Sequence, residues 1–142
     1  MIFWDVNLWV YAFRPDSPLH MSARDELQDA TRGGDSFLFC PHVAASFLRL
    51  VTNPRIFAHP SVLEEAWSFV DVLEARQHAV RVEVDMMTFG IFKHVSLVSR
   101  ASGNDIPDAL LASIAIRHDA TFVTADRRFE RFDGLPLRML SE

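Results

Sequence analysis

Residues 104–126 read NDIPDALLASIAIRHDATFVTAD and combine a helical pattern with a short apolar run. Pro107 fits the first turn of the predicted helix, where its missing N–H costs nothing. The run Thr121–Thr124 predicts a buried strand, and Asp126 follows it directly. A helix that leads into a buried strand is the repeating unit of a parallel sheet, so this stretch predicts an α/β fold.

The same alternation continues on the amino-terminal side. Ile2–Trp4 predicts a strand that ends at Asp5, and Phe37–Cys40 predicts another. Further strands are expected at 80–84 and 135–140, and helices at 8–13, 20–31, 43–51, 61–76 and 86–100. The order predicts a parallel sheet with helices on both faces. Ser61 and Glu64 resemble a capping box at the start of one helix.

Composition narrows the class of protein. The 142 residues are 49% hydrophobic and 23% charged, which predicts one globular domain over 1–142. The single cysteine, Cys40, has no intramolecular partner, as expected in a reducing cytoplasm. No apolar run approaches the ~20 residues of a membrane span, so neither a membrane helix nor a signal peptide is expected. A net charge of −5 argues against a general nucleic-acid coat but suits an acidic metal site flanked by arginines.

Three aspartates are expected at one edge of the predicted sheet. Asp5 and Asp126 follow strands, and Asp108 lies in the first turn of a helix. Ligands of parallel sheets bind outside the carboxyl ends of the strands. Any one of these acids is also compatible with a helix cap. Three carboxylates ~5 Å apart at a dielectric of ~20, however, repel by roughly 3 kcal/mol per pair, so together they predict a divalent cation. Oxygen ligands favour Mg²⁺, with Mn²⁺ as a substitute.

Other chemistries find less support. The six histidines show no metal-ligand spacing and Cys40 has no partner, which argues against zinc. No glycine-rich phosphate loop is present, which disfavours an NTPase or a dehydrogenase. An aspartyl-phosphate phosphatase needs a second aspartate two residues after the first, where this chain has Asn7. A phosphoacceptor domain needs a lysine after a late strand, and the one lysine, Lys93, falls in a predicted helix.

Three segments carry a family resemblance: DVNLWVYAF at 5–13, FLRLVTNPRIF at 47–57 and GNDIPDALLASIAIRHDATFVTADRRFERFDGL at 103–135. In order and separation they resemble PIN-domain ribonucleases, specifically VapC toxins of VapBC type II toxin–antitoxin modules. The resemblance implies a three-layer α/β/α sandwich with a central, mostly parallel sheet of four or five strands, as a single PIN domain. It also implies a Mg²⁺-dependent endoribonuclease, a homodimer, and inhibition by a cognate VapB-type antitoxin. Asp5, Asp108 and Asp126 fall on the acidic positions of the family.

One position departs from the family pattern. The family often places a glutamate on the helix before Arg49, and this chain has Ser46 there. Ser46 can bond a water of the site but adds no charge. Asp105 is the nearest replacement acid, although a cap role suits it as well. Asn7 and Thr124 are expected to orient carboxylates or waters of the site. The alternative for both is an ordinary hydrogen bond to the local backbone.

The expected reaction is hydrolysis of an RNA phosphodiester by a metal-activated water, with no protein nucleophile. Arg49, Arg127 and Arg128 are candidates for RNA phosphate or antitoxin carboxylate, and a solvated surface role is the alternative for each. Trp9 and Phe13 share a helical face, which is typical of core residues; the alternative is an apolar surface for a partner. A different class remains open, a catalytically inactive PIN-fold module that keeps the antitoxin or RNA surface. Which RNA is cut, and with one metal or two, stays open.

Overall fold

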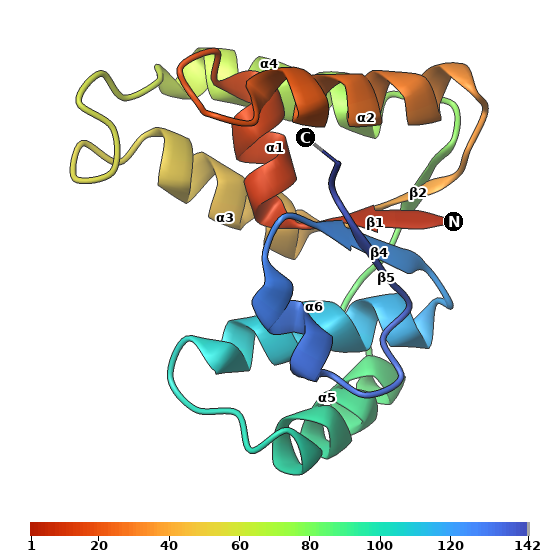
Figure 1. The fold of residues 1–142 in the computed structure, drawn as a ribbon. Coiled ribbons are helices and arrows are strands. Elements are labelled where there is room, and N and C mark those ends of the chain that lie inside the picture. The colour runs from red at the N-terminus through yellow and green to blue at the C-terminus, as the bar shows by residue number, and fades with distance from the viewer. Residues whose placement is uncertain (142) are drawn as a thin grey trace.

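A computed structural model of the chain describes residues 1–141; Glu142, which the predicted domain range includes, lies outside the described residues. Figure 1 shows the secondary-structure elements in chain order. They are β1 (Ile2–Trp4), α1 (Val6–Phe13), α2 (His20–Arg32), β2 (Phe37–Phe39), α3 (Pro41–Val51), α4 (Leu63–Glu74), β3 (Ala79–Arg81), α5 (Met86–Val98), α6 (Asp105–Arg117), β4 (Thr121–Thr124), the 3-10 helix η1 (Arg127–Arg131) and β5 (Leu137–Met139). All the predicted strands and helices are confirmed, with shifts of a few residues at their ends.

The sheet of residues 1–141 has five strands in the order β3-β2-β1-β4-β5, and every pair is parallel. The central pair aligns Trp4 of β1 with Val123 of β4. Backbone hydrogen bonds extend this pairing beyond the strands, since Asp5 N donates to Val123 O at 2.9 Å. The predicted fold class is therefore confirmed, with a sheet that is wholly parallel and β5 at an edge, where Pro136 is tolerated.

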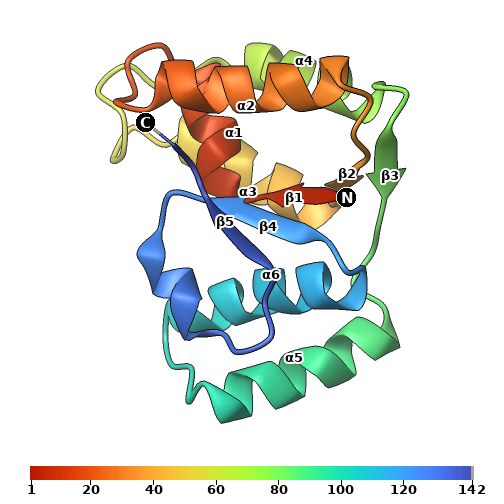
Figure 2. The same ribbon diagram turned by 45° about the vertical axis from the view of Figure 1, so that its right-hand side comes forward.

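Helices cover both faces of the sheet. In Figures 1 and 2, α1, α2, α3 and α4 lie on one side of the strands, and α5 and α6 lie on the other. This is the three-layer α/β/α arrangement, which right-handed crossovers between parallel strands produce. None of the helices in residues 1–141 has the length and apolar character needed to span a membrane.

Alternate residues of the short strands pack into opposite layers. In β1, Phe3 meets Phe122 with ring centroids 5.7 Å apart, and Trp4 meets Phe37 at 4.9 Å. Successive strand side chains point to opposite faces, so the adjacent aromatics of β1 serve two cores. Both are buried, which holds the end of β1, and hence the following Asp5, in a fixed place.

The helix face that carries Trp9 and Phe13 packs into the core. Trp9 of α1 is 1% exposed and packs against the rings of Phe39 and Phe47. Phe13 is half-buried against Phe47 and Phe69. The core position expected for Trp9 is therefore confirmed, and the alternative of a partner surface is wrong for Trp9, because the helix face that carries it packs onto α3 and α4.

The functional edge lies where the chain changes direction across the sheet. From β1 the chain adds β2 and β3 on one side, then returns to add β4 and β5 on the other. The carboxyl ends of β1 and β4 therefore adjoin each other at the switch point, where parallel sheets bind their ligands. Asp5 follows β1, and Asp126 lies two residues beyond β4.

Candidate active site

Asp5 is a buried carboxylate at the carboxyl end of β1. It is 5% exposed, and although it occupies the N-cap position of α1, its side chain makes no capping hydrogen bond. Instead Oδ2 accepts a hydrogen bond from Thr124 Oγ1 at 2.7 Å. The pKa of Asp5 is raised to about 6, mainly by burial; the charges of Asp108 and Asp126 contribute to the rise, and the Thr124 hydrogen bond opposes it. No salt bridge in residues 1–141 involves Asp5, so its charge has no cationic partner there.

Asp108 shares a pocket with Asp5. The pocket has a volume of about 160 Å³, and Asn7 and Ser46 also line it. Asp108 reaches it from the first turn of α6, where the helix dipole favours a carboxylate. Burial raises the pKa of Asp108, while nearby Arg128 and Arg131 lower it. The structure thus brings together two of the three predicted acids.

Asp126 is close enough to interact electrostatically with both acids, but its side chain is bound to Arg128. Arg128 Nε lies 3.1 Å from Oδ1, and Arg128 Nη2 lies 2.8 Å from Oδ2. The backbone N–H of Arg128 also donates to Oδ1, so Asp126 caps η1. The Arg128 hydrogen bond is the main reason that the pKa of Asp126 is lowered. Asp126 is therefore neutralised by its own neighbour and does not line the pocket.

Asp105 and Asp108 share a second arginine. Arg131 Nη1 lies 2.9 Å from Asp105 Oδ1, and Arg131 Nη2 lies 3.4 Å from Asp108 Oδ2. The guanidinium also lies over the ring of Phe132, 5.0 Å from its centroid. Asp105 does not line the pocket. The structure thus gives Asp105 an ion-pairing role, and its predicted role as a substitute ligand gains no support from this geometry.

Within residues 1–141, no three histidine, cysteine, aspartate or glutamate side chains are grouped closely enough to hold a metal ion. The three predicted carboxylates are therefore not all free in this structure. Arg128 forms an ion pair with Asp126, and Arg131 forms one with Asp108. The residues that do share the pocket nevertheless fit a small hard cation. Two carboxylates, the Asn7 amide and the Ser46 hydroxyl offer oxygen ligands beside the His42 imidazole and the Arg49 guanidinium, and Asp5 takes part in no salt bridge of the described residues.

The remaining predicted residues fall into two groups. Asn7, Ser46 and Arg49 line the pocket with Asp5 and Asp108. Thr124 lies behind Asp5 and joins it to Asp126, because Thr124 Oγ1 accepts from Asp126 N at 3.0 Å while donating to Asp5. Arg127 and Arg128 lie outside the pocket lining, and Arg127 pairs with Glu130 at 3.2 Å.

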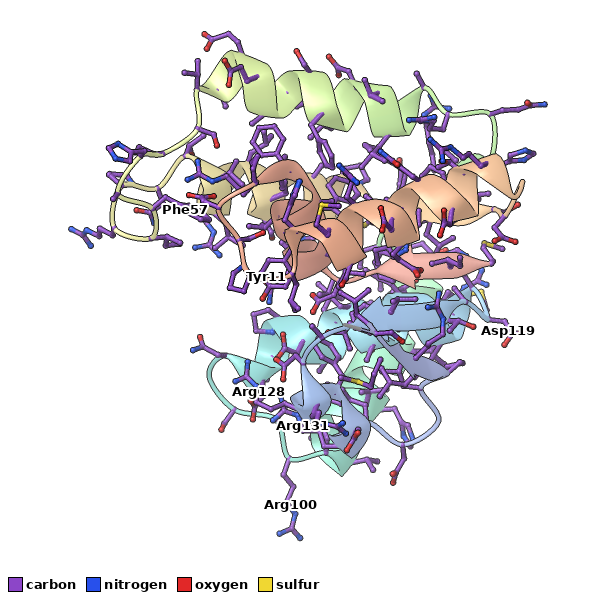
Figure 3. All side chains as sticks on the ribbon, turned by 45° about the horizontal axis from the view of Figure 1, so that its top comes forward. Tyr11, Phe57, Arg100, Asp119, Arg128 and Arg131 are labelled. Carbon is purple, nitrogen blue, oxygen red and sulfur yellow. The ribbon has the colours of Figure 1, made fainter. Side chains whose placement is uncertain are left out.

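Three residues of this region were missed by the sequence reasoning. Arg131 pairs with two acids, His42 lines the pocket, and Tyr11 lies near enough for Asp5 and Asp126 to raise its pKa, after the larger effect of burial. Figure 3 shows Tyr11, Arg128 and Arg131 on the same side of the molecule, with Asp119 on the opposite side. Tyr11 had a weak signal in the sequence, since it lies on α1, the helix that begins directly after Asp5. No sequence signal marked Arg131, because Asp105 and Asp108, the acids with which it pairs, are far away in the sequence.

The chain matches a known protein family. The family described as PIN domain matches residues 2–135, and the chain belongs to that family. The curated relatives described next are named VapC ribonucleases, and the chain belongs to their family. Ribonuclease VapC43 from Mycobacterium tuberculosis is 37% identical over 138 residues, which cover 97% of this chain and 94% of the relative. Ribonuclease VapC31 from the same species is 37% identical over 132 residues, 93% of each chain.

Solved structures share the fold. VapBC2 from Rickettsia felis, bound to a DNA fragment from its promoter, aligns with a TM-score of 0.74 and 21% identity, over 99% of this chain and 100% of that one. The Mycobacterium tuberculosis VapC20 toxin, which cleaves the sarcin–ricin loop, aligns with a TM-score of 0.69 and 13% identity, over 97% and 99% of the two chains. At these identities the structures support the three-layer fold alone.

Proposed function

We propose that the chain is the toxin of a VapBC-type module and hydrolyses RNA phosphodiester bonds with Mg²⁺, or with Mn²⁺ in its place. One observation carries the proposal: Asp5, a buried carboxylate without a cationic partner, faces the same small pocket as Asp108 at the switch point of the sheet. No salt bridge of residues 1–141 neutralises Asp5, so a bound cation would complete the charge balance of this site. The ribonuclease relatives agree with this chemistry.

Asp5 and Asp108 would bind the cation, and Asp126 would join them. The cation would supply Lewis acidity, which activates water and neutralises charge that develops on the phosphate. Thr124 holds the carboxylate of Asp5 in one orientation through its 2.7 Å hydrogen bond. Asn7 and Ser46 are placed to bond the attacking water or a phosphate oxygen, since both line the pocket with the acids.

Arg49 is the proposed contact to RNA. It is exposed on α3, lines the pocket that contains Asp5, and takes part in none of the salt bridges of residues 1–141. A free guanidinium beside a cation site suits the phosphate that flanks the scissile bond. Arg127, 79% exposed on η1, is a second candidate farther from the acids.

Protein partners are proposed on separate grounds. A cognate VapB-type antitoxin is expected because the solved neighbours include a VapBC assembly, and a module that acts on cellular RNA places both proteins in the cytoplasm. A homodimer is supported by α5, where Met86 and Leu97 are 79% and 67% exposed. These residues are eleven apart, or about three turns, and therefore share one helix face with Gly90 between them.

The test of the enzymatic proposal is cleavage of total cellular RNA by the purified protein. We expect cleavage with Mg²⁺ or Mn²⁺ and none with a chelator. Attack by water leaves no 2′,3′-cyclic phosphate, so end-group mapping of the fragments checks the nucleophile. If the protein binds RNA and antitoxin but cleaves no RNA with either cation, it is the inactive binding module instead.

A further inference from the structure

The two arginines beside the acidic pocket are held very differently. Arg131 has a side chain 30% exposed, bonds two acids and covers the Phe132 ring. Arg128 has a side chain 65% exposed, and its one salt bridge is to Asp126. Arg131 is therefore shared between two acids and a ring, whereas Arg128 pairs with a single carboxylate and is exposed, so that water or a phosphate can replace its partner.

Arg128 engages both oxygens of Asp126. Its Nε lies 3.1 Å from Oδ1 and 3.0 Å from Oδ2, and its Nη2 lies 2.8 Å from Oδ2. A divalent cation requires the same negative charge and the same lone pairs. The guanidinium and the cation are therefore competitors for Asp126.

Asp126 remains linked to the pocket while Arg128 holds it. Its backbone N–H donates to Thr124 Oγ1 at 3.0 Å, and the same hydroxyl donates to Asp5 at 2.7 Å. Its charge contributes to the raised pKa of Asp5. Asp126 is thus joined to Asp5 through Thr124, while its carboxylate is held by Arg128.

We propose that Arg128 exchanges partners during RNA binding. It holds Asp126 while RNA is absent, transfers to a phosphate of the bound RNA, and thereby frees Asp126 for the cation. Arg128 is then a positioning residue that makes cation and RNA binding mutually favourable, since coupling between two ligands is reciprocal. This inference rests on the proposed ribonuclease function and adds the order in which its site is assembled.

The first test measures Mn²⁺ affinity by calorimetry in the absence of RNA. Arg128→Gln removes the competitor, and Arg127→Gln is the matched control, because it removes the same charge from the next residue. A unit charge about 6 Å from a divalent cation weakens its binding about tenfold even at the dielectric of water. We expect about tenfold tighter binding for Arg128→Gln and a change of less than about twofold for Arg127→Gln. Equal affinities, or weaker binding for Arg128→Gln, overturn the proposal.

The second test measures RNA binding in a chelator, by the anisotropy of a fluorescent single-stranded RNA. Asp126→Asn keeps a good N-cap for η1 but releases Arg128, so we expect about tenfold tighter RNA binding. In the Arg128→Gln background the same change removes the same negative charge without freeing a guanidinium, so its gain should be much smaller. This double-mutant cycle isolates the exchange. Additive effects overturn it.

Failure of the inference and failure of the function are distinguishable. A protein that cleaves RNA with Mg²⁺ but shows the same Mn²⁺ affinity in Arg128→Gln and Arg127→Gln contradicts the exchange alone. A protein that meets both binding tests and cleaves no RNA contradicts the proposed function and keeps the competition for Asp126.

Discussion

Replacing Asp5 by Asn should stabilise the protein in the absence of a divalent cation. Burial raises the pKa of Asp5 from 3.8 to about 6, which means that the folded state disfavours the charged carboxylate. A shift of this size corresponds to about 3 kcal/mol at neutral pH. The Asn side chain has nearly the same shape, and its amide oxygen can still accept the hydrogen bond of Thr124. The Asp5→Asn variant therefore loses the charge penalty and keeps the contact.

The sign of the effect depends on pH. Well below pH 3.8, Asp5 is protonated in both the folded and unfolded states, and the two proteins should be equally stable. Between pH 4 and 6 the unfolded state releases the proton first, so wild-type stability falls as the pH rises. Above pH 6 the advantage of Asp5→Asn is complete.

The assay is thermal unfolding in a chelator, followed by circular dichroism at pH 4 and pH 7. A difference of about 3 kcal/mol raises the Tm of a chain of this size by about 6 to 12 °C. Asp119→Asn is the matched control, because Asp119 is exposed and its φ of 51° also suits Asn. Saturating Mg²⁺ should narrow the difference, since it stabilises only the wild type. The reasoning is refuted if Asp5→Asn is no more stable than wild type at pH 7, or if the difference is undiminished at pH 4.

Three further predictions follow from single contacts. Ser46→Glu should tighten Mn²⁺ binding, because Ser46 lines the pocket, whereas Asp105→Asn should change the affinity little. A titration in which Asp105→Asn weakens Mn²⁺ binding and Ser46→Glu leaves it unchanged would place the missing acid at Asp105. Arg14→Leu should lower the free energy of unfolding by about 2 to 4 kcal/mol, because buried Arg14 bonds Asp16, His59 O and Ser61 Oγ. An unchanged midpoint of chemical unfolding would show that these three contacts do not stabilise the fold. Leu97→Glu should convert a dimer to a monomer in light scattering if α5 forms the interface, and a dimer that survives it excludes this face.

Hydrophobic patterning was sufficient to predict the fold because the three central strands, β2, β1 and β4, are short and mostly buried runs. Each strand of a parallel sheet covered on both faces reads as such a run, and the helices between them show their own period. Asp5 and Asp108 were predictable for the same reason, since a strand end and a helix start define the edge of the sheet. Thr124 was expected to orient a carboxylate, and its bond to Asp5 agrees with that expectation.

The ion pairs could not be predicted in the same way. Arg131 meets Asp108 across 23 positions of sequence, and nothing local marks that pairing. Ser61, which resembled one half of a capping box, instead accepts a hydrogen bond from Arg14, and α4 begins after Val62 without a side-chain cap. In both cases a tertiary contact decides between partners that local spacing leaves equivalent.

The most direct test of a cation-dependent hydrolytic centre at Asp5 is the single-turnover rate of RNA cleavage. Wild type, Asp5→Asn and the Asp119→Asn control are compared on one RNA, with Mg²⁺ and with a chelator. We expect wild type and Asp119→Asn to cleave at equal rates with Mg²⁺ and not at all in the chelator. Asp5→Asn should be slower by about a hundredfold or more while it remains folded, because loss of the charge removes both cation binding and transition-state stabilisation. Cleavage by Asp5→Asn at the wild-type rate, or cleavage by wild type in the chelator, would contradict the account.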